Sequence, residues 1–360
     1  MIAANNIEKM QGQPVLVLGD MIADIYLYGN ISRISREAPV LVLEQASEKI
    51  VAGGAANVIN NIATMGGQVY AVGLVGDDRT AEGLAEILRH NGAHVEGFIH
   101  EPGRATISKT RIVAGGRTTV SQQIVRVDRE DKRPMGPRQE KELSEYLEKL
   151  LPRAKGVVLS DYGSGTITDK LLRQVLEYCS THHILTIVDS RYDIMRFQQV
   201  DYIKQNDAEL SSAIGREFAT EEDLVQGGCR LVYEMHSKGA LITRGEDGMS
   251  LFERKAGQDA AVPVDADTHS SQGFDTAYRD AVFHVTHIPV TDKSEVYDVS
   301  GAGDTCVAAF ILGMAAGIDT VTASRISNEA SGIAVRKMGT AVVYAEELRQ
   351  KFRMQAEAAI

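Results

Sequence analysis

The alternation of buried-strand and helical patterns constrains the fold of this chain more than any other feature. Val15–Leu18 is a short apolar run, and Gly53–Gly67 then carries Val, Ile and Met on one helical face. Gln68–Val75 returns to a strand pattern and Ala81–His90 to a helical one. Parallel strands need helical crossovers, so this order predicts a mainly parallel sheet.

The same alternation resumes in the second half of the chain. The 360 residues contain no internal repeat, so we expect a single α/β domain covering 1–360. The predicted elements are helix Arg138–Leu151, strand Gly156–Ser160, helix Thr168–Cys179, strands Ile184–Asp189 and Tyr202–Lys204, helix Glu222–His236, strands Ala240–Thr243 and Met249–Phe252, a strand near His287–Val290, and helices Gly303–Ala316 and Val321–Lys337.

Two segments interrupt this alternation with short strands of alternating polarity. We expect Met21–Gly29 to lead into a turn and the strands to be inserted at about 30–52 and 101–128. Such insertions can pair into one small β lid that covers the mouth of the domain and excludes water. A third segment, 255–283, is rich in Asp, Ser, Thr and His and predicts an irregular insertion.

Charge and cysteine content exclude several classes of function. The formal net charge is −11, and an acidic surface repels phosphate backbones and anionic lipids, so we expect neither nucleic acid nor a membrane as partner. The three cysteines are widely spaced and form no disulfide framework. No signal peptide or membrane-length apolar run is found, and a cytoplasmic protein is expected.

Asp298–Thr305, DVSGAGDT, is the segment with the clearest chemical potential. A Gly-Ala-Gly turn enters an apolar helix there, and free N–H groups at a helix start attract anions. Asp304 at this point could accept a proton from an attacking hydroxyl. The residues alone equally allow a plain N-cap and a tight turn. The P-loop, protein-kinase and HExxH motifs are not found, and GxGxxG fails at Cys306.

Two long segments carry a resemblance to a known family. Asp298–Phe310, DVSGAGDTCVAAF, and Gly53–Gly67, GGAANVINNIATMGG, resemble the two signatures of the ribokinase-like (phosphofructokinase-B type) sugar kinases. Val72–Leu88 and Leu241–Gly248 also resemble this family, so the similarity runs across nearly the whole chain. It implies a doubly wound α/β fold with a small β lid, and an ATP-dependent sugar kinase.

Within that family the similarity is greatest to the D-glycero-D-manno-heptose 7-phosphate kinases. Ile34–Val40, Thr106–Arg111 and Gln122–Asp128 resemble the lid strands of that branch. The chain ends after the kinase region, so a stand-alone kinase is expected rather than one fused to a nucleotidyltransferase. The branch implies phosphorylation of the anomeric hydroxyl and a homodimer that forms through the lid.

The resemblance also implies a role for individual residues. Asp304 corresponds to the catalytic base, and Asn206 and Glu209 to an N-x-x-E element that orders Mg²⁺, mostly through water. Taken alone, Asn206 would be a turn residue and Glu209 a solvated helix residue. The remaining correspondences are Gly301, Ala302 and Gly303 for the anion hole, Asp20, Asp24, Gly53, Gly54 and Asn57 for the sugar, and Thr243, Gly245, Gly248 and Asn328 for the nucleotide.

A phosphorylated acceptor would need positive charge, which Lys109 and Arg111 on one face of a lid strand could supply, with Arg104 as a further candidate. Charges that protect an edge strand from aggregation explain the same residues equally well. The chain departs from the heptose kinases at Asp189–Tyr192, where Arg191 would replace a lysine of their Asp-Pro-Lys-Gly stretch.

Other functions stay open at this stage. The acceptor could be ribose, fructose, a fructose phosphate or a nucleoside, and a requirement for a monovalent cation such as K⁺ is undecided. A non-catalytic sugar- or nucleotide-binding relative is the alternative from another class, although an intact Asp304 argues against it. An NAD-dependent dehydrogenase is disfavoured by the missing third glycine of its motif.

Overall fold

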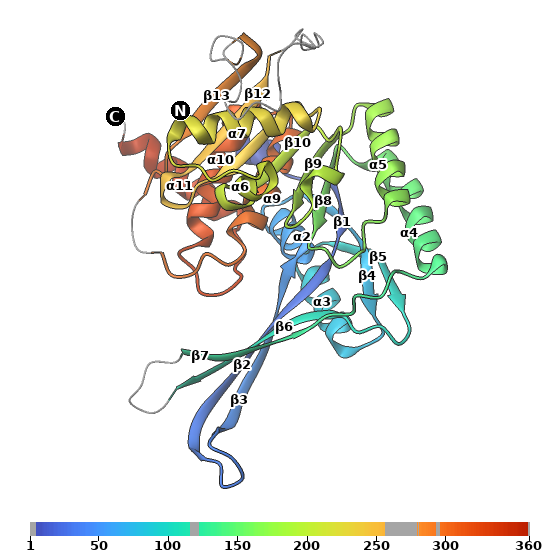
Figure 1. Cartoon of the computed structure of the whole chain (residues 1–360), viewed down its shortest axis with the longest axis vertical. Coiled ribbons are helices and arrows are strands. Elements are labelled where there is room, and N and C mark those ends of the chain that lie inside the picture. The colour runs from blue at the N-terminus through green and yellow to red at the C-terminus, as the bar shows by residue number, and fades with distance from the viewer. Residues whose placement is uncertain (1–4, 116–121, 256–278, 280, 293–295, 359–360) are drawn as a thin grey trace.

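The computed structural model describes residues 5–115, 122–255, 279, 281–292 and 296–358 (Figure 1). Its main sheet has nine strands in the order β13-β12-β11-β10-β9-β8-β1-β4-β5. All neighbouring strands from β11 to β5 are parallel, and β12 and β13 are antiparallel. The strands are β1 (Pro14–Gly19), β4 (Gln68–Gly76), β5 (His94–Glu101), β8 (Gly156–Asp161), β9 (Leu185–Ser190), β10 (Tyr202–Asn206), β11 (Gly239–Thr243), β12 (Met249–Arg254) and β13 (Phe283–Ile288).

Helices cover both faces of this sheet and create two separate apolar cores. On β1, Val15 and Val17 belong to one core while Leu16 and Leu18 belong to the other, as expected for a strand buried on both faces. One core receives α1 (Asn5–Lys9), α2 (Ala55–Thr64), α3 (Arg79–His90), α9 (Ala302–Ala315), α10 (Thr320–Ala334) and α11 (Ala345–Ala358); the other receives α4 (Pro137–Leu150), α5 (Asp169–His182), α6 (Asp207–Ile214) and α7 (Glu221–Glu234).

A second sheet projects from the domain as a long arm (Figure 1). Its four strands run in the order β3-β2-β6-β7. Strand β2 (Met21–Ile34) begins just after β1, and β3 (Leu41–Gly54) leads directly into α2. Strand β6 (Ile107–Gly115) pairs with β2 in parallel, and β7 (Gln122–Arg129) pairs with β6 in antiparallel fashion. This lid therefore shares its base with the carboxyl edge of the main sheet.

The predicted fold class is confirmed, and several boundaries are wrong. The first lid insertion does not start near residue 30, because Met21–Gly29 is part of β2 rather than the approach to a turn. Met21–Gly29 is mainly apolar and mostly buried, and only Asn30–Ile34 at the outer end of β2 is exposed throughout, so the strand runs from the domain into the lid without a turn. Strand β13 spans Phe283–Ile288 rather than a segment near His287–Val290, and it ends before Pro289, which has no N–H group to continue the ladder. Most of the predicted insertion 255–283 lies outside the described residues.

Candidate active site

Asp304 lies in the first turn of α9, where the helix meets the carboxyl ends of the central strands. Gly301 caps this helix with φ of 79°, a left-handed conformation that glycine adopts without strain. The carboxyl group of Asp304 is only 5% exposed. Its Oδ2 accepts a hydrogen bond from Asn57 Nδ2 at 2.8 Å, and its Oδ1 accepts one from Tyr162 Oη at 2.8 Å.

This environment sets the ionisation of Asp304. Burial raises the pKa of its carboxyl group to about 6, while the hydrogen bonds from Asn57 and Tyr162 act in the opposite direction. Such a group is largely ionised at neutral pH, yet it binds a proton more strongly than an exposed aspartate. These are the properties that a general base requires.

The glycines before and after Ala302 allow other groups to approach the start of α9. A methyl group on Gly301 would lie 2.6 Å from Asn57 Nδ2, and one on Gly303 would lie 2.6 Å from Lys204 Nζ. Both distances are shorter than a van der Waals contact, so neither position admits a side chain without movement. The Gly-Ala-Gly turn thus lies against the Asn57 amide at Gly301 and against the Lys204 ammonium at Gly303.

Lys204, in the middle of β10, is a buried cation that the sequence did not suggest. Its Nζ lies 2.9 Å from Asp189 Oδ2. Although burial opposes it, the neighbouring carboxylates of Asp189 and Glu209 raise the pKa of Lys204, so it remains charged. Arg191, the expected replacement for the family lysine, lines the same small cavity of about 90 Å³ but is itself exposed.

A larger cleft of about 340 Å³ meets this cavity at Gly303. It contains every residue that was expected at the nucleotide: Thr243, Gly245, Gly248 and Asn328. Gly245 and Gly248 have φ of 55° and 85°, so the turn between β11 and β12 depends on glycine at both places. Asn328 Nδ2 donates to the Pro289 carbonyl and holds that wall of the cleft.

Asn206 and Glu209 form a capping box at the start of α6. Asn206 Oδ1 accepts from the Glu209 N–H at 2.7 Å, and Glu209 Oε2 accepts from the Asn206 N–H at 2.8 Å. Asn206 is therefore more than a turn residue and Glu209 more than a solvated helix residue, because each accepts a hydrogen bond from the other's backbone N–H. Burial raises the pKa of Glu209, which lines the small cavity beside Lys204.

Asp20 directly follows β1 and is fully buried. Its Oδ2 accepts from the backbone N–H groups of Tyr162 and Ser164, and its Oδ1 accepts from that of Thr166. In this arrangement the carboxylate holds the loop after β8 in place. Burial raises its pKa despite these bonds.

Asp24 on β2 faces the site from the lid. It forms an ion pair with Arg111 on β6, and its Oδ2 accepts a hydrogen bond from Thr340 at 2.9 Å. Gly53 on β3 leaves room for this carboxylate, because a methyl group there would lie 2.6 Å from Asp24 Oδ2. Gly54, with φ of 54°, turns the chain from β3 into α2 and so places Asn57 beside Asp304.

Lys109 and Arg104, the two other basic residues that were candidates for binding a substrate phosphate, differ in position. Lys109 Nζ lies over the ring of Tyr162, 5.5 Å from its centroid, and therefore close to Asp304. Arg104 is turned away from the site, because it pairs with Glu101 and donates to the carbonyl oxygens of Asp131, Arg133 and Pro134. Arg104 is thus part of the scaffold and is withdrawn as a phosphate-binding candidate.

The arrangement was compared with known proteins. The model of the pfkB family carbohydrate kinases matches residues 13–347. The chain belongs to this family. As a carbohydrate kinase it is a phosphotransferase whose acceptor is an alcohol group, and the resemblance found in the two signature segments is confirmed.

Curated relatives and solved structures of kinases agree with this assignment. The chain is 35% identical to the bifunctional protein HldE of Geobacter sulfurreducens over 92% of its own length, and 33% identical to that of Paramagnetospirillum magneticum over 95%. It spans only 61% and 64% of those two proteins. Among solved structures, phosphofructokinase-2 of Escherichia coli in complex with substrates and products has a TM-score of 0.73 at 16% identity, covering 96% of this chain and 99% of that one.

Ribokinase of Arabidopsis thaliana complexed with ribose and ATP has a TM-score of 0.66 at 19% identity, covering 94% of this chain and 98% of that one. These identities establish a shared fold.

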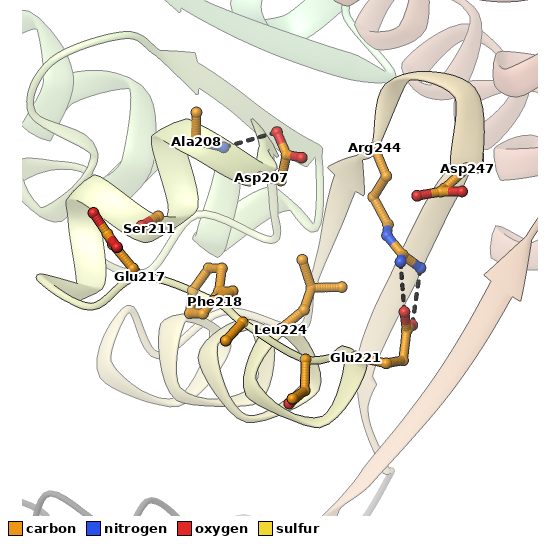
Figure 2. A pocket seen from close by; sticks show the side chains of 11 residues that line it. Asp207, Ala208, Ser211, Glu217, Phe218, Glu221, Leu224, Arg244 and Asp247 are labelled. Atoms are coloured by element: carbon orange, nitrogen blue, oxygen red, sulfur yellow. Dashed lines mark hydrogen bonds and ion pairs between the residues drawn. The ribbon is translucent and has the colours of Figure 1, made fainter.

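The kinase has a further cavity of about 520 Å³ between α6, α7 and the β11–β12 turn. Figure 2 shows that Arg244 points into it and pairs with Glu221 through both guanidinium nitrogens. Arg244 lies between Thr243 and Gly245 in the chain, yet its charge is directed to Glu221 rather than to the cleft that these two residues line. This cavity is therefore distinct from the site around Asp304.

The described residues include neither a cluster of metal-binding side chains nor a helix of membrane-spanning length and apolarity. They contain no group of three or more His, Cys, Asp or Glu side chains arranged to hold a metal ion. No helix among them is both long and apolar enough to cross a membrane.

Proposed function

We propose that this kinase transfers the γ-phosphate of ATP to a sugar hydroxyl, with Asp304 as the general base. The observation that carries the proposal is the position of Asp304: it lies at the start of α9, where the nucleotide cleft and the small polar cavity meet at Gly303. A nucleotide in the cleft and an acceptor in the cavity would therefore approach each other beside this carboxylate.

The groups around Asp304 suit phosphoryl transfer. The acceptor hydroxyl would give its proton to Asp304 as its oxygen bonds to the γ-phosphorus, and the bond from that phosphorus to the bridging oxygen of ADP would break. The N–H groups of the Gly301–Gly303 turn and the ammonium of Lys204 would face the charge that spreads over the transferred group. Positioning and electrostatics then provide most of the rate.

The described residues fit a metal that arrives with the nucleotide rather than one held by the protein alone. They offer no three-ligand cluster. Glu209 is a half-buried carboxylate beside Lys204 and could bind Mg²⁺ through water. Bound there, Mg²⁺ would neutralise charge on the phosphates. Asn206 would support it by keeping the Glu209 side chain in the capping box.

D-glycero-D-manno-heptose 7-phosphate is the acceptor we propose, phosphorylated at the anomeric hydroxyl to give the 1,7-bisphosphate. The lid segments that resemble heptose kinases support this choice, as does the 33–35% identity to the bifunctional proteins named HldE. A phosphorylated acceptor would find positive charge at Lys109 and Arg191, one above and one beside Tyr162.

A homodimer through the lid is part of the same proposal. On β7, the side chains of Ile124, Val125 and Val127 are 37%, 46% and 53% exposed, which is unusual for apolar residues on an extended arm. Leu41 on β3 is also exposed. A second lid packed on this arm would remove these side chains from water. Light scattering of the wild type and of Val127→Lys tests this, with a monomeric wild type as the contrary result.

Release of ADP from Mg-ATP, measured with a coupled assay against a panel of acceptors, tests the proposed activity. The panel contains heptose 7-phosphate, fructose 6-phosphate, fructose, ribose and adenosine. Turnover with heptose 7-phosphate alone supports both the reaction and the acceptor. Turnover with another member keeps the reaction and refutes the acceptor, and silence across the panel with ATP still bound contradicts the proposed reaction.

A further inference from the structure

Tyr162 is the residue nearest to the proposed base whose role neither the sequence motifs nor the family match assigns. It follows directly after β8, and its hydroxyl donates to Asp304 Oδ1 at 2.8 Å. Asn57 Nδ2 donates to the other oxygen, Oδ2, also at 2.8 Å. Each carboxylate oxygen thus has one neutral donor and keeps a lone pair that can receive the proton of an acceptor.

The position of Tyr162 is fixed from two sides. Its backbone N–H donates to Asp20 Oδ2 at 2.8 Å, and the N–H of Ser164 donates to the same oxygen at 3.1 Å. Asp20 is fully buried, so water does not compete for these bonds. On the other side, the ammonium of Lys109 on the lid lies 5.5 Å from the centroid of the ring. The hydroxyl therefore reaches Asp304 from a backbone that is held in place.

The hydroxyl can act as a permanent donor. Burial and then the charge of Asp304 raise the pKa of Tyr162 well above its usual range, so it stays protonated over the working range of an enzyme. Its hydrogen bond stabilises the ionised form of Asp304 and opposes the effect of burial. The other charged groups around this pair are Asp20 after β1, Asp161 at the end of β8, Asp189 on β9, Arg191 after β9, Lys204 on β10, Glu209 on α6 and Lys109 on the lid.

Lys204 cannot replace the hydroxyl. Its ammonium is paired with Asp189 at 2.9 Å and faces Gly303 rather than the Asp304 carboxylate oxygens. A lysine bonded directly to Asp304 would lower its basicity, whereas a phenol orients the carboxylate without neutralising it.

We propose that Tyr162 is a positioning residue for phosphoryl transfer: its hydroxyl fixes the Asp304 carboxylate in the orientation in which it receives the proton of the acceptor. The inference rests on the proposed role of Asp304 as base. It assigns the loop after β8 a part in the chemistry, which Asp20 supports by holding the backbone of that loop.

The test compares Tyr162→Phe with the wild type in the pH profile of kcat/KM for the best acceptor of the panel. We expect the acidic limb to move from about 6 to higher pH and the rate near that pH to fall about 10-fold or more, because a hydrogen bond to a charged group is lost. The KM for ATP should stay unchanged. Tyr192→Phe removes a hydroxyl from an exposed neighbouring ring and should leave the profile as it is.

A double-mutant cycle tests whether Tyr162 acts through Asp304. If Tyr162 acts only through Asp304, Tyr162→Phe costs nothing further in the background of Asp304→Asn. The inference is overturned if the acidic limb of a folded Tyr162→Phe protein stays in place, or if the substitution lowers the residual rate of Asp304→Asn by the same factor as that of the wild type. Near-normal activity of Asp304→Asn alone would instead contradict the proposed function.

Discussion

Replacing Gly303 with alanine should separate the stability of this kinase from its activity. The added methyl group would lie 2.6 Å from Lys204 Nζ and 3.3 Å from its Cε. Carbon atoms in contact are about 3.5–4.0 Å apart, so the ammonium has to move by roughly 1 Å. This movement takes the charge away from the start of α9 and lengthens its 2.9 Å contact with Asp189.

Gly303→Ala has two opposing effects on the free energy of unfolding and one large effect on catalysis. Alanine in place of glycine stabilises a helix by about 0.5–1 kcal/mol, which offsets part of the cost of displacing Lys204. We therefore expect the free energy of unfolding to change by no more than about 1 kcal/mol. A misplacement of about 1 Å in a reacting centre can lower the reaction rate on the order of 100-fold, and we expect kcat to fall by about that factor.

The assay measures kcat by ADP release at saturating Mg-ATP and acceptor, together with the unfolding midpoint by calorimetry. Gly313→Ala is the matched control, because it makes the same change in the same helix where the new methyl group would lie 3.2 Å from the apolar Ala323 Cβ. It should alter the midpoint slightly and leave kcat alone. A folded Gly303→Ala protein with the kcat of the wild type would refute the reasoning.

Three further outcomes follow from the site. Activity should fall as pH drops through about 6, because the pKa of Asp304 is about 6 and only the ionised form accepts a proton; a profile flat through that pH contradicts this. Lys204→Met should lower the free energy of unfolding by about 3–5 kcal/mol in urea titrations, since it leaves Asp189, whose side chain is only 12% exposed, without its cation, and a stable variant would argue against a charged pair. Asn206→Ala should lower the free energy of unfolding by about 1 kcal/mol, because it removes the capping box of α6. An unchanged unfolding midpoint in calorimetry would contradict this.

The elements that could be predicted are those whose pattern is set by burial on both faces. Pro14–Gly19 is apolar throughout because helices cover both sides of the central sheet. His94–Glu101 was not predicted, since it lies at the edge of the sheet and alternates charged with apolar residues. Ala345–Ala358 was also left unassigned, although Leu348 and Phe352 are buried at helical spacing.

The residues of the site also fall into those that the sequence could predict and those that it could not. Asp304 and its glycines form one continuous motif, so their chemistry is visible in the sequence. Tyr162 lies just after β8 and Lys204 lies within β10, and only the strand order of the folded sheet brings them beside α9. Arg104 shows the opposite error, because a basic residue near a lid strand gives no sign that backbone carbonyl oxygens bind it.

The most direct test of the account is the activity of Asp304→Asn, measured together with its affinity for ATP. A general base contributes about 100- to 10,000-fold, so kcat should fall by a factor in that range. The Kd of ATP should remain within about twofold of the wild type, because the nucleotide cleft touches α9 at Ala302 and Gly303 rather than at the carboxylate. A folded Asp304→Asn protein with near-normal kcat would contradict the assignment of Asp304 as the base.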